Sequence, residues 1–111
     1  MNQSLSLLQL DNGATPLKVD LIHSKKAAMI LRALNHKLRQ QTLKLIDENQ
    51  KMTVTEIYVK LRLEQSVASQ HLAILRRAGI VVTVREGKFI FYMVDYNRLE
   101  QVNQFVEQLV G

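Results

Sequence analysis

The side chains best suited to do chemistry in this chain fall in a short polar stretch in its second half. Hydroxyls, amides and guanidinium groups recur there at helical spacing, and two further cations flank Gly87. Amides can bond an adenine edge with two hydrogen bonds, small hydroxyls allow close approach, and cations bind phosphate. These residue types suit contact with a nucleic acid. The candidates are Gln65, Ser66, Ser69, Gln70, Arg76, Arg77, Arg85 and Lys88.

Other kinds of chemistry find little support. The three histidines, His23, His36 and His71, fall on different predicted helices without the spacing of metal ligands. His71 lies inside the polar stretch, where we expect it to brace the helix or to contact a phosphate. The chain has no cysteine and shows neither a glycine-rich phosphate loop nor a Ser-His-Asp arrangement. We therefore expect no enzyme, no metal and no cofactor.

The polar stretch needs a helix and a hairpin to position it. Ala68, Leu72 and Leu75 form an apolar stripe, so a helix over about 65–77 would pack on that side and turn its polar side outward. Gly79 suits a left-handed cap at the helix end. Two β-rich runs, 80–85 and 88–94, then flank Glu-Gly-Lys and predict a hairpin. A helix followed at once by a basic hairpin is typical of a winged helix-turn-helix, with the helix in a major groove and the wing (81–94) on the backbone or in a minor groove.

The remaining elements are predicted to be helical. Thr53 and Glu56 match a capping box that starts a helix running to about Leu61. Another helix runs through Leu38 to Asn49, after a break at Asn35 and His36; Lys37 and Arg39, at its start, are further candidates for backbone phosphate contacts. Helices over 17–34 and 97–110 have wide apolar faces that need covering. Turn signals at residues 11–13 and at Pro16 mark residues 1–16 as a flexible arm, or as a short helix of its leucines against a partner. The predicted fold, mainly α with a small β-hairpin wing, is a winged helix-turn-helix in the order α-α-α-α-β-β-α over residues 17–111.

Composition agrees with a single DNA-binding domain. The chain has 111 residues and a net charge of +5. Thirteen of the 15 basic residues but only five of the 10 acidic ones lie between Lys25 and Lys88. A positive centre between acidic flanks suits a module that meets phosphates with its middle and protein with its ends. The sequence shows no signal peptide and no apolar run near 18 residues, so we expect a cytoplasmic protein without a membrane partner.

In these motifs the chain resembles the ArsR/SmtB family of bacterial winged-helix repressors. The resemblance covers residues 18–110 and is most specific at 66–72, at 75–81 and in the wing from Arg85 to Tyr92. It implies a homodimer, joined through the first and last helices, that binds an inverted repeat in a promoter. It also implies repression that an inducer relieves.

The chain departs from that family where many members bind metal. On the third helix, Tyr58 and Lys60 stand where the family has a Cys-x-Cys pair. On the last helix, Asp95 and Asn97 fall at the first ligand pair, and the later positions fall near Gln108 and Gly111. Lysine is no metal ligand, and one carboxylate does not hold zinc. We predict that both sites are absent, which leaves an effector unidentified.

Two alternatives remain open on the sequence alone. A winged helix can serve as a protein-interaction module or co-regulator that does not read DNA. A regulator of RNA is a weaker alternative. A palindromic consensus selected from random DNA would distinguish sequence-specific DNA binding from both.

Overall fold

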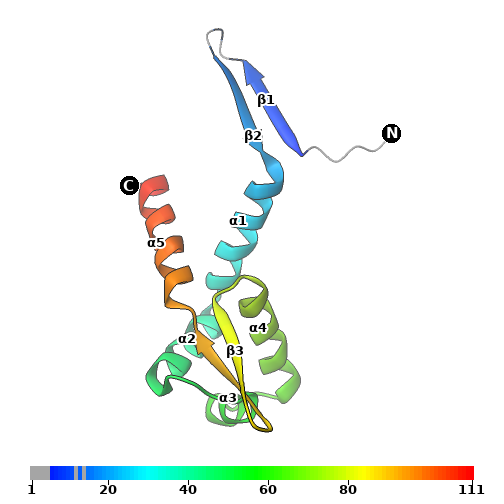
Figure 1. Ribbon diagram of the computed structural model, residues 1–111, viewed down its shortest axis with the longest axis vertical. Coiled ribbons are helices and arrows are strands. Elements are labelled where there is room, and N and C mark those ends of the chain that lie inside the picture. The colour runs from blue at the N-terminus through cyan, green and yellow to red at the C-terminus, as the bar shows by residue number, and fades with distance from the viewer. Residues whose placement is uncertain (1–5, 12, 14) are drawn as a thin grey trace, which may run out of the picture.

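The structure, a computed structural model, describes residues 6–11, 13 and 15–111. In that part of the chain, five helices and two separate antiparallel hairpins follow one another (Figure 1). The elements are β1 (Leu7–Asp11), β2 (Pro16–Asp20), α1 (Leu21–Leu34), α2 (Lys37–Asn49), α3 (Val54–Leu61), α4 (Gln65–Arg77), β3 (Val81–Glu86), β4 (Phe89–Val94) and α5 (Tyr96–Val110).

The hydrophobic core lies where α2, α3 and α4 meet the base of the second hairpin. Ile46, Ile57, Leu72, Leu75 and Ile80 are fully buried there. They come from α2, α3, α4 and the residue just before β3, and so pack the helix-turn-helix against the start of the strand that follows it. The predicted winged helix-turn-helix is confirmed by this arrangement.

Both local signals predicted around α3 and α4 are present. Thr53 Oγ1 accepts from the Glu56 N–H at 3.2 Å while Glu56 Oε1 accepts from the Thr53 N–H at 2.9 Å, so the capping box is formed. At the end of α4, Gly79 has a φ of 74°. The Ile80 N–H then reaches back to the Leu75 carbonyl at 3.0 Å, as in a Schellman motif. This cap turns the chain sharply from α4 into β3.

The N-terminal region differs from the prediction. The first helix begins at Leu21, not Leu17, because Leu17 lies in β2, which pairs with β1. Asp20 accepts from the His23 N–H at 3.0 Å and fixes the helix start. The alternative of a short helix of leucines is wrong for residues 7–10, which are extended; Leu5 lies outside the described residues. Residues 1–5 also lie outside the described residues, and for them the flexible arm stays a prediction.

The chain is far from spherical. Its extents are 58 × 38 × 27 Å and its radius of gyration is 18.0 Å, whereas a compact domain of this length has about 13 Å. Figure 1 shows the reason: α1 and α5 diverge from the core, and the β1–β2 hairpin continues beyond α1. Within the described chain, no helix has both the length and the apolar character needed to cross a membrane.

Candidate nucleic-acid interface

Helix α4 separates its buried and exposed side chains as the sequence predicts. Ala68, Leu72 and Leu75 are buried, while Val67, His71 and Ile74 are half-buried at the edges. The outward residues fall within about 140° of helix circumference at 100° per residue. All of them are exposed: Gln65, Ser66, Ser69, Gln70, Ala73, Arg76 and Arg77.

The polar side of α4 has no competing partner in the described part of the chain. The side chains of its two glutamines, two serines and two arginines form no hydrogen bond with any other described residue. The hydrogen bonds of α4 come from the His71 ring and from the backbone. Arg62, in the left-handed region at φ 57°, turns the chain from α3 into α4. The Leu63 N–H then bonds to the Tyr58 carbonyl at 2.9 Å, which fixes that turn. A rigidly held helix thus presents an unengaged row of donors and acceptors.

Arg39 was predicted to contact DNA, but the structure buries it. Only 8% of it is exposed, and its Nε donates to the Ala33 carbonyl at 2.6 Å. One terminal nitrogen donates to the Arg32 carbonyl at 3.0 Å and the other lies 3.2 Å from His71 Nδ1. These carbonyls end α1, where helices leave their last carbonyls without helical partners. Arg39 therefore joins α1 and α2 to α4 and is not available to a phosphate.

His71 is placed as a brace for α4. Burial is the main cause that holds its pKa below the usual 6.5, and the charges of His36 and Arg39 act in the same direction. The imidazole is thus favoured in its neutral form, with Nδ1 able to accept from Arg39. Its ring also lies 4.8 Å from the ring of His36, whose Nδ1 caps α2 by accepting from the Leu38 N–H. Of the two roles considered for His71, this geometry supports bracing.

The wing ends in a short basic turn. Glu86 pairs with Phe89, which leaves Gly87 and Lys88 as a two-residue turn, and Gly87 has the left-handed φ of 62° that favours glycine at its first position. Arg85 and Lys88 are exposed, and Arg85 Nε donates to the Gly87 carbonyl at 3.2 Å. Lys51 binds both oxygens of Glu86 at 2.7 and 2.6 Å. The carboxylate at the wing tip is thereby neutralised, and the two basic side chains remain uncompensated.

Tyr92 lies where the wing approaches α3 and α4. Its backbone exchanges two hydrogen bonds with Met52, just before α3, at 3.1 and 2.7 Å. Its side chain joins Ser69, Arg76 and Arg77 in lining an open depression of about 460 Å³ between α4 and β4. The depression brings three of the predicted contact residues together on the wing side of α4. A role for Tyr92 beside α4 could not be recognised from the sequence, because a strand tyrosine ordinarily packs within its sheet.

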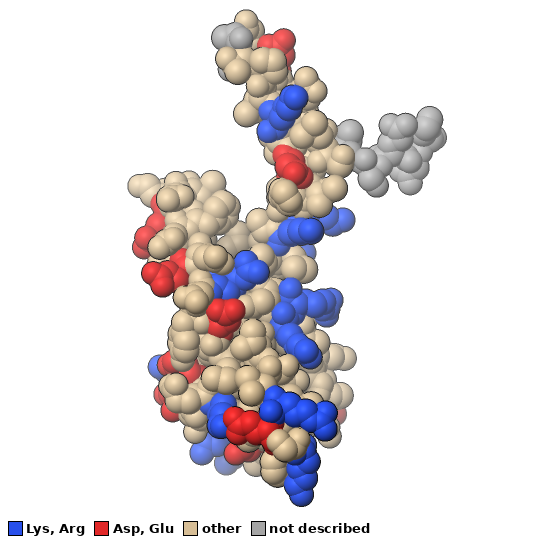
Figure 2. All heavy atoms as spheres, viewed as in Figure 1, with Lys and Arg blue, Asp and Glu red and all other residues tan. Residues whose placement is uncertain are grey.

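The charge distribution favours one side of the molecule. Figure 2 shows Lys and Arg side chains along the side formed by α1 and α4 and at the wing end, while acidic side chains lie along α5. Among the described residues the ion pairs are His23–Asp20 and Lys51–Glu86, so the exposed cations of α4 face no acidic partner. Lys37 is exposed at the start of α2. Arg32 is also exposed, near the end of α1; the sequence did not single it out because that helix was expected to form a dimer surface.

The family metal positions hold no ligand set. Lys60 is exposed and Tyr58 half-buried on α3. Throughout residues 6–11, 13 and 15–111, no three His, Cys, Asp or Glu side chains come together as a metal site. The residues present on α3 do not fit a thiolate-bound metal.

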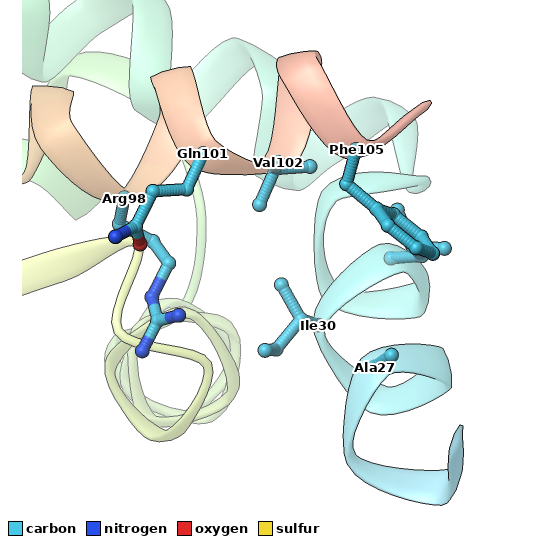
Figure 3. Close-up of a pocket in the computed structure, with 7 residues that line it drawn as sticks. Ala27, Ile30, Arg98, Gln101, Val102 and Phe105 are labelled. Carbon is cyan, nitrogen blue, oxygen red and sulfur yellow. The ribbon is translucent and has the colours of Figure 1, made fainter. Parts of the chain in front are cut away.

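An apolar cleft separates α1 from α5, on the side away from the wing. Figure 3 shows Ile30 and Ala27 of α1 facing Val102 and Phe105 of α5, with Arg98 at one end. The cleft has a volume of about 150 Å³. Beyond the cleft, α1 exposes Ile22 and α5 exposes Leu109 and Val110, whereas the exposed Met29 lies beside Ile74 of α4.

Comparison with known proteins agrees with this geometry. Residues 36–83 match the family described as "Bacterial regulatory protein, arsR family". An uncharacterized HTH-type transcriptional regulator of Methanocaldococcus jannaschii is 38% identical over 85 residues, 77% of this chain and 96% of the relative. The transcriptional activator HlyU of Vibrio cholerae is 34% identical over 87 residues, 78% of this chain and 80% of the relative.

A solved structure shares the fold. The transcriptional repressor PagR of Bacillus anthracis superposes with a TM-score of 0.63 at 24% identity. The superposition covers 99% of the PagR chain but 78% of this one, so about a fifth of this chain has no counterpart there.

Proposed function

The chain belongs to the arsR family of bacterial regulatory proteins and is a transcriptional regulator rather than an enzyme, and we propose that it represses transcription as a homodimer bound to an inverted-repeat promoter site. In this proposal α4 enters the major groove and the wing contacts the backbone or the minor groove of the same half-site. Gln65, Ser66, Ser69 and Gln70 read bases, while Lys37, Arg76, Arg77, Arg85 and Lys88 bind phosphates.

The observation that carries the proposal is the unengaged polar side of α4. Buried hydrophobic residues hold the opposite side, and no described part of the chain satisfies its amides and hydroxyls. The side is also flanked by uncompensated cations of α4 and the wing. A helix of this kind fits the width of the major groove, and cations at its edges suit the phosphates that line the groove.

The dimer part of the proposal rests on α1 and α5. Their facing cleft is lined mainly by apolar side chains (Figure 3), and their outer ends expose three large hydrophobic residues, Ile22, Leu109 and Val110. Exposed apolar surface of this extent marks an interaction site. A two-fold related second copy would cover it and would place two copies of α4 on successive major grooves, which requires an inverted repeat.

The similar proteins include one named an activator and one named a repressor. Tyr58 and Lys60 leave no thiolate site on α3, and the signals we propose instead are an organic ligand, a partner protein or the protein's own abundance.

Selection of bound sequences from a random DNA pool tests the proposal directly. A palindromic consensus is expected, and Gln70→Ala should cost about 1–3 kcal/mol on that site with relaxed preference at one base. Replacing Arg85 or Lys88 by Gln should weaken binding to all sequences and lower the salt slope by about one unit each. Lys18→Gln, at the opposite end of the molecule, is the matched charge control and should leave the slope unchanged.

Each outcome separates the candidate functions. No enriched sequence, with equal binding to random DNA, would favour a protein-interaction module, and tighter binding to RNA competitors would favour an RNA regulator. Equal losses for Gln70→Ala on the consensus and on random DNA would remove the base-reading role.

A further inference from the structure

The N-terminal hairpin has two chemically different faces. Residues directly opposite each other in an antiparallel pair project to the same side, and successive residues alternate. The register places the aliphatic pairs Leu8–Val19 and Leu10–Leu17 on one face. The other face carries the pairs Leu7–Asp20, Gln9–Lys18 and Asp11–Pro16. The hairpin is therefore amphipathic, with four aliphatic side chains on one side.

The apolar face is left largely uncovered within the described chain. Leu8, Leu10 and Leu17 are 37%, 47% and 54% exposed, and Val19 is half-buried. An isolated two-stranded hairpin is only marginally stable in water. A ribbon that keeps such a face needs another surface to pack against.

The hairpin is fixed to α1 rather than hanging from it. The Leu21 N–H donates to the Ser6 carbonyl at 3.0 Å, and Asp20, the last residue of β2, caps α1. Strand and helix follow each other with no residue between them. The direction of α1 therefore sets where the apolar face lies.

The surface that suits this face is another copy of the same chain. The radius of gyration of 18.0 Å exceeds the roughly 13 Å of a compact domain because the hairpin, α1 and α5 leave the core. Protruding elements that a chain does not cover itself are typical of intertwined oligomers. Helix α5 offers matching apolar residues, Phe105, Leu109 and Val110, that are 44%, 68% and 80% exposed.

We propose that the β1–β2 hairpin is a dimerisation arm whose apolar face packs on the α1–α5 surface of a second copy. The inference rests on the proposed homodimer and adds to it an element outside the winged domain. In a two-fold dimer each copy gives one arm and receives one, so the surface buried by the arms counts twice.

Crosslinking from the two faces of β1 tests the arm. Because the chain has no cysteine, a benzophenone maleimide can be attached to Leu10→Cys, on the apolar face, or to its neighbour Gln9→Cys, on the polar face. In mixtures of isotopically light and heavy copies, Leu10→Cys should crosslink to peptides of α1 or α5 in the other copy. Gln9→Cys should give at least about fivefold less product. Equal yields from the two positions, or no product between copies, would overturn the arm.

A paired substitution gives a second, independent measurement. Leu10→Thr with Leu17→Thr keeps good strand formers opposite each other but removes two of the four aliphatic side chains of the apolar face. Its dimer dissociation constant should rise about a hundredfold in sedimentation equilibrium, which corresponds to about 2.8 kcal/mol. Gln9→Thr with Lys18→Thr, the adjacent pair on the polar face, is the control and should change it less than about threefold.

The outcomes distinguish the arm from the dimer itself. A wild-type chain that sediments as a monomer at all concentrations would remove the proposed homodimer together with the arm. A stable wild-type dimer that the Leu10 and Leu17 pair of substitutions leaves unchanged would remove the arm alone.

Discussion

Arg39→Met separates a bracing arginine from a phosphate-binding one. Methionine keeps most of the aliphatic length of the side chain but removes the donors that lie 2.6, 3.0 and 3.2 Å from Ala33 O, Arg32 O and His71 Nδ1. The Arg39 side chain is almost fully buried, so the acceptors it leaves have little access to water. The two α1 carbonyls then lose a charged donor each.

The expected loss is large for a domain of this size. A hydrogen bond to a charged group contributes about 1.5–3 kcal/mol, and such bonds are not additive when they share a donor group. We expect Arg39→Met to lower the free energy of unfolding by about 2–4 kcal/mol, against a total of about 5–15 kcal/mol for a typical domain. Among the folded molecules, the salt dependence of DNA binding should keep its wild-type slope because no phosphate contact is lost.

Urea unfolding and binding titrations over a range of salt concentrations measure the two effects separately. Both are done at one protein concentration, because a dimer gains stability with concentration. Arg76→Met is the matched variant: Arg76 is exposed without an acidic partner in the described chain, so its stability should change by less than about 0.5 kcal/mol. Its salt slope should fall by about one unit. If Arg39→Met unfolds like the wild type and loses a unit of salt slope, the bracing role is refuted.

Two further variants test local geometry. Gly79→Ala would place a Cβ 2.8 Å from Arg98 Nε at a φ of +74°, whereas Gly87→Ala has a similar φ of +62° and nothing within 4 Å. Gly87→Ala should therefore lower the free energy of unfolding by about 1–2 kcal/mol, for the left-handed backbone alone. Gly79→Ala should lower it measurably more in urea unfolding. Equal losses would mean that the Arg98 side chain moves aside without a loss of stability. The pKa of His71 is held below 6.5 in the folded state, so the unfolded chain binds more protons. The contribution of His71 to the free energy of unfolding is therefore fully present above pH 6.5 and falls as the pH drops below that value. His71→Gln should flatten that fall in unfolding curves recorded between about pH 7.5 and pH 5.5, and an unchanged pH dependence would assign the proton uptake to another group.

The winged part of the fold could be predicted because its signals are local. The stripe of Ala68, Leu72 and Leu75 determines which side of α4 is buried, and Gly79 and Gly87 mark the positive φ values at the end of α4 and at the wing turn. Period and turn chemistry agree there, and each can be recognised within a few residues of sequence. The polar side of α4 follows from the same periodicity.

The N-terminal hairpin was missed because its leucines suit more than one structure. The run PLKVD alternates over five residues and LLQLD only from Leu8 to Asp11, which is too short to separate a strand from a helix end by period. The turn residues Asp11 and Gly13 between them were interpreted as the end of an arm, although a turn between two alternating runs also favours a hairpin.

The role of Arg39 could not be predicted for a different reason. Periodicity places it on α2 but does not say that the last carbonyls of α1 lie beside it. Burial of a guanidinium depends on acceptors brought from other elements, Arg32 and Ala33 in α1 and His71 in α4. Such a contact belongs to the packing of three helices rather than to any local pattern.

The junction between the wing and α5 has a mechanical consequence. Asp95 alone separates β4 from α5; its N–H is bonded to the Ile80 carbonyl at 2.8 Å, and its carboxylate caps α5 by accepting from the Arg98 N–H at 3.1 Å. Because only one residue lies at this joint, the direction of α5 is fixed relative to the wing, and the two hydrogen bonds of Tyr92 with Met52 fix the wing to the start of α3. In the proposed homodimer, a change in the angle between the two copies of α5 would therefore alter the separation of the two copies of α4. A ligand that altered that angle would not need to touch the residues proposed to contact DNA. Binding would then depend on the spacing between half-sites as strictly as on their sequence.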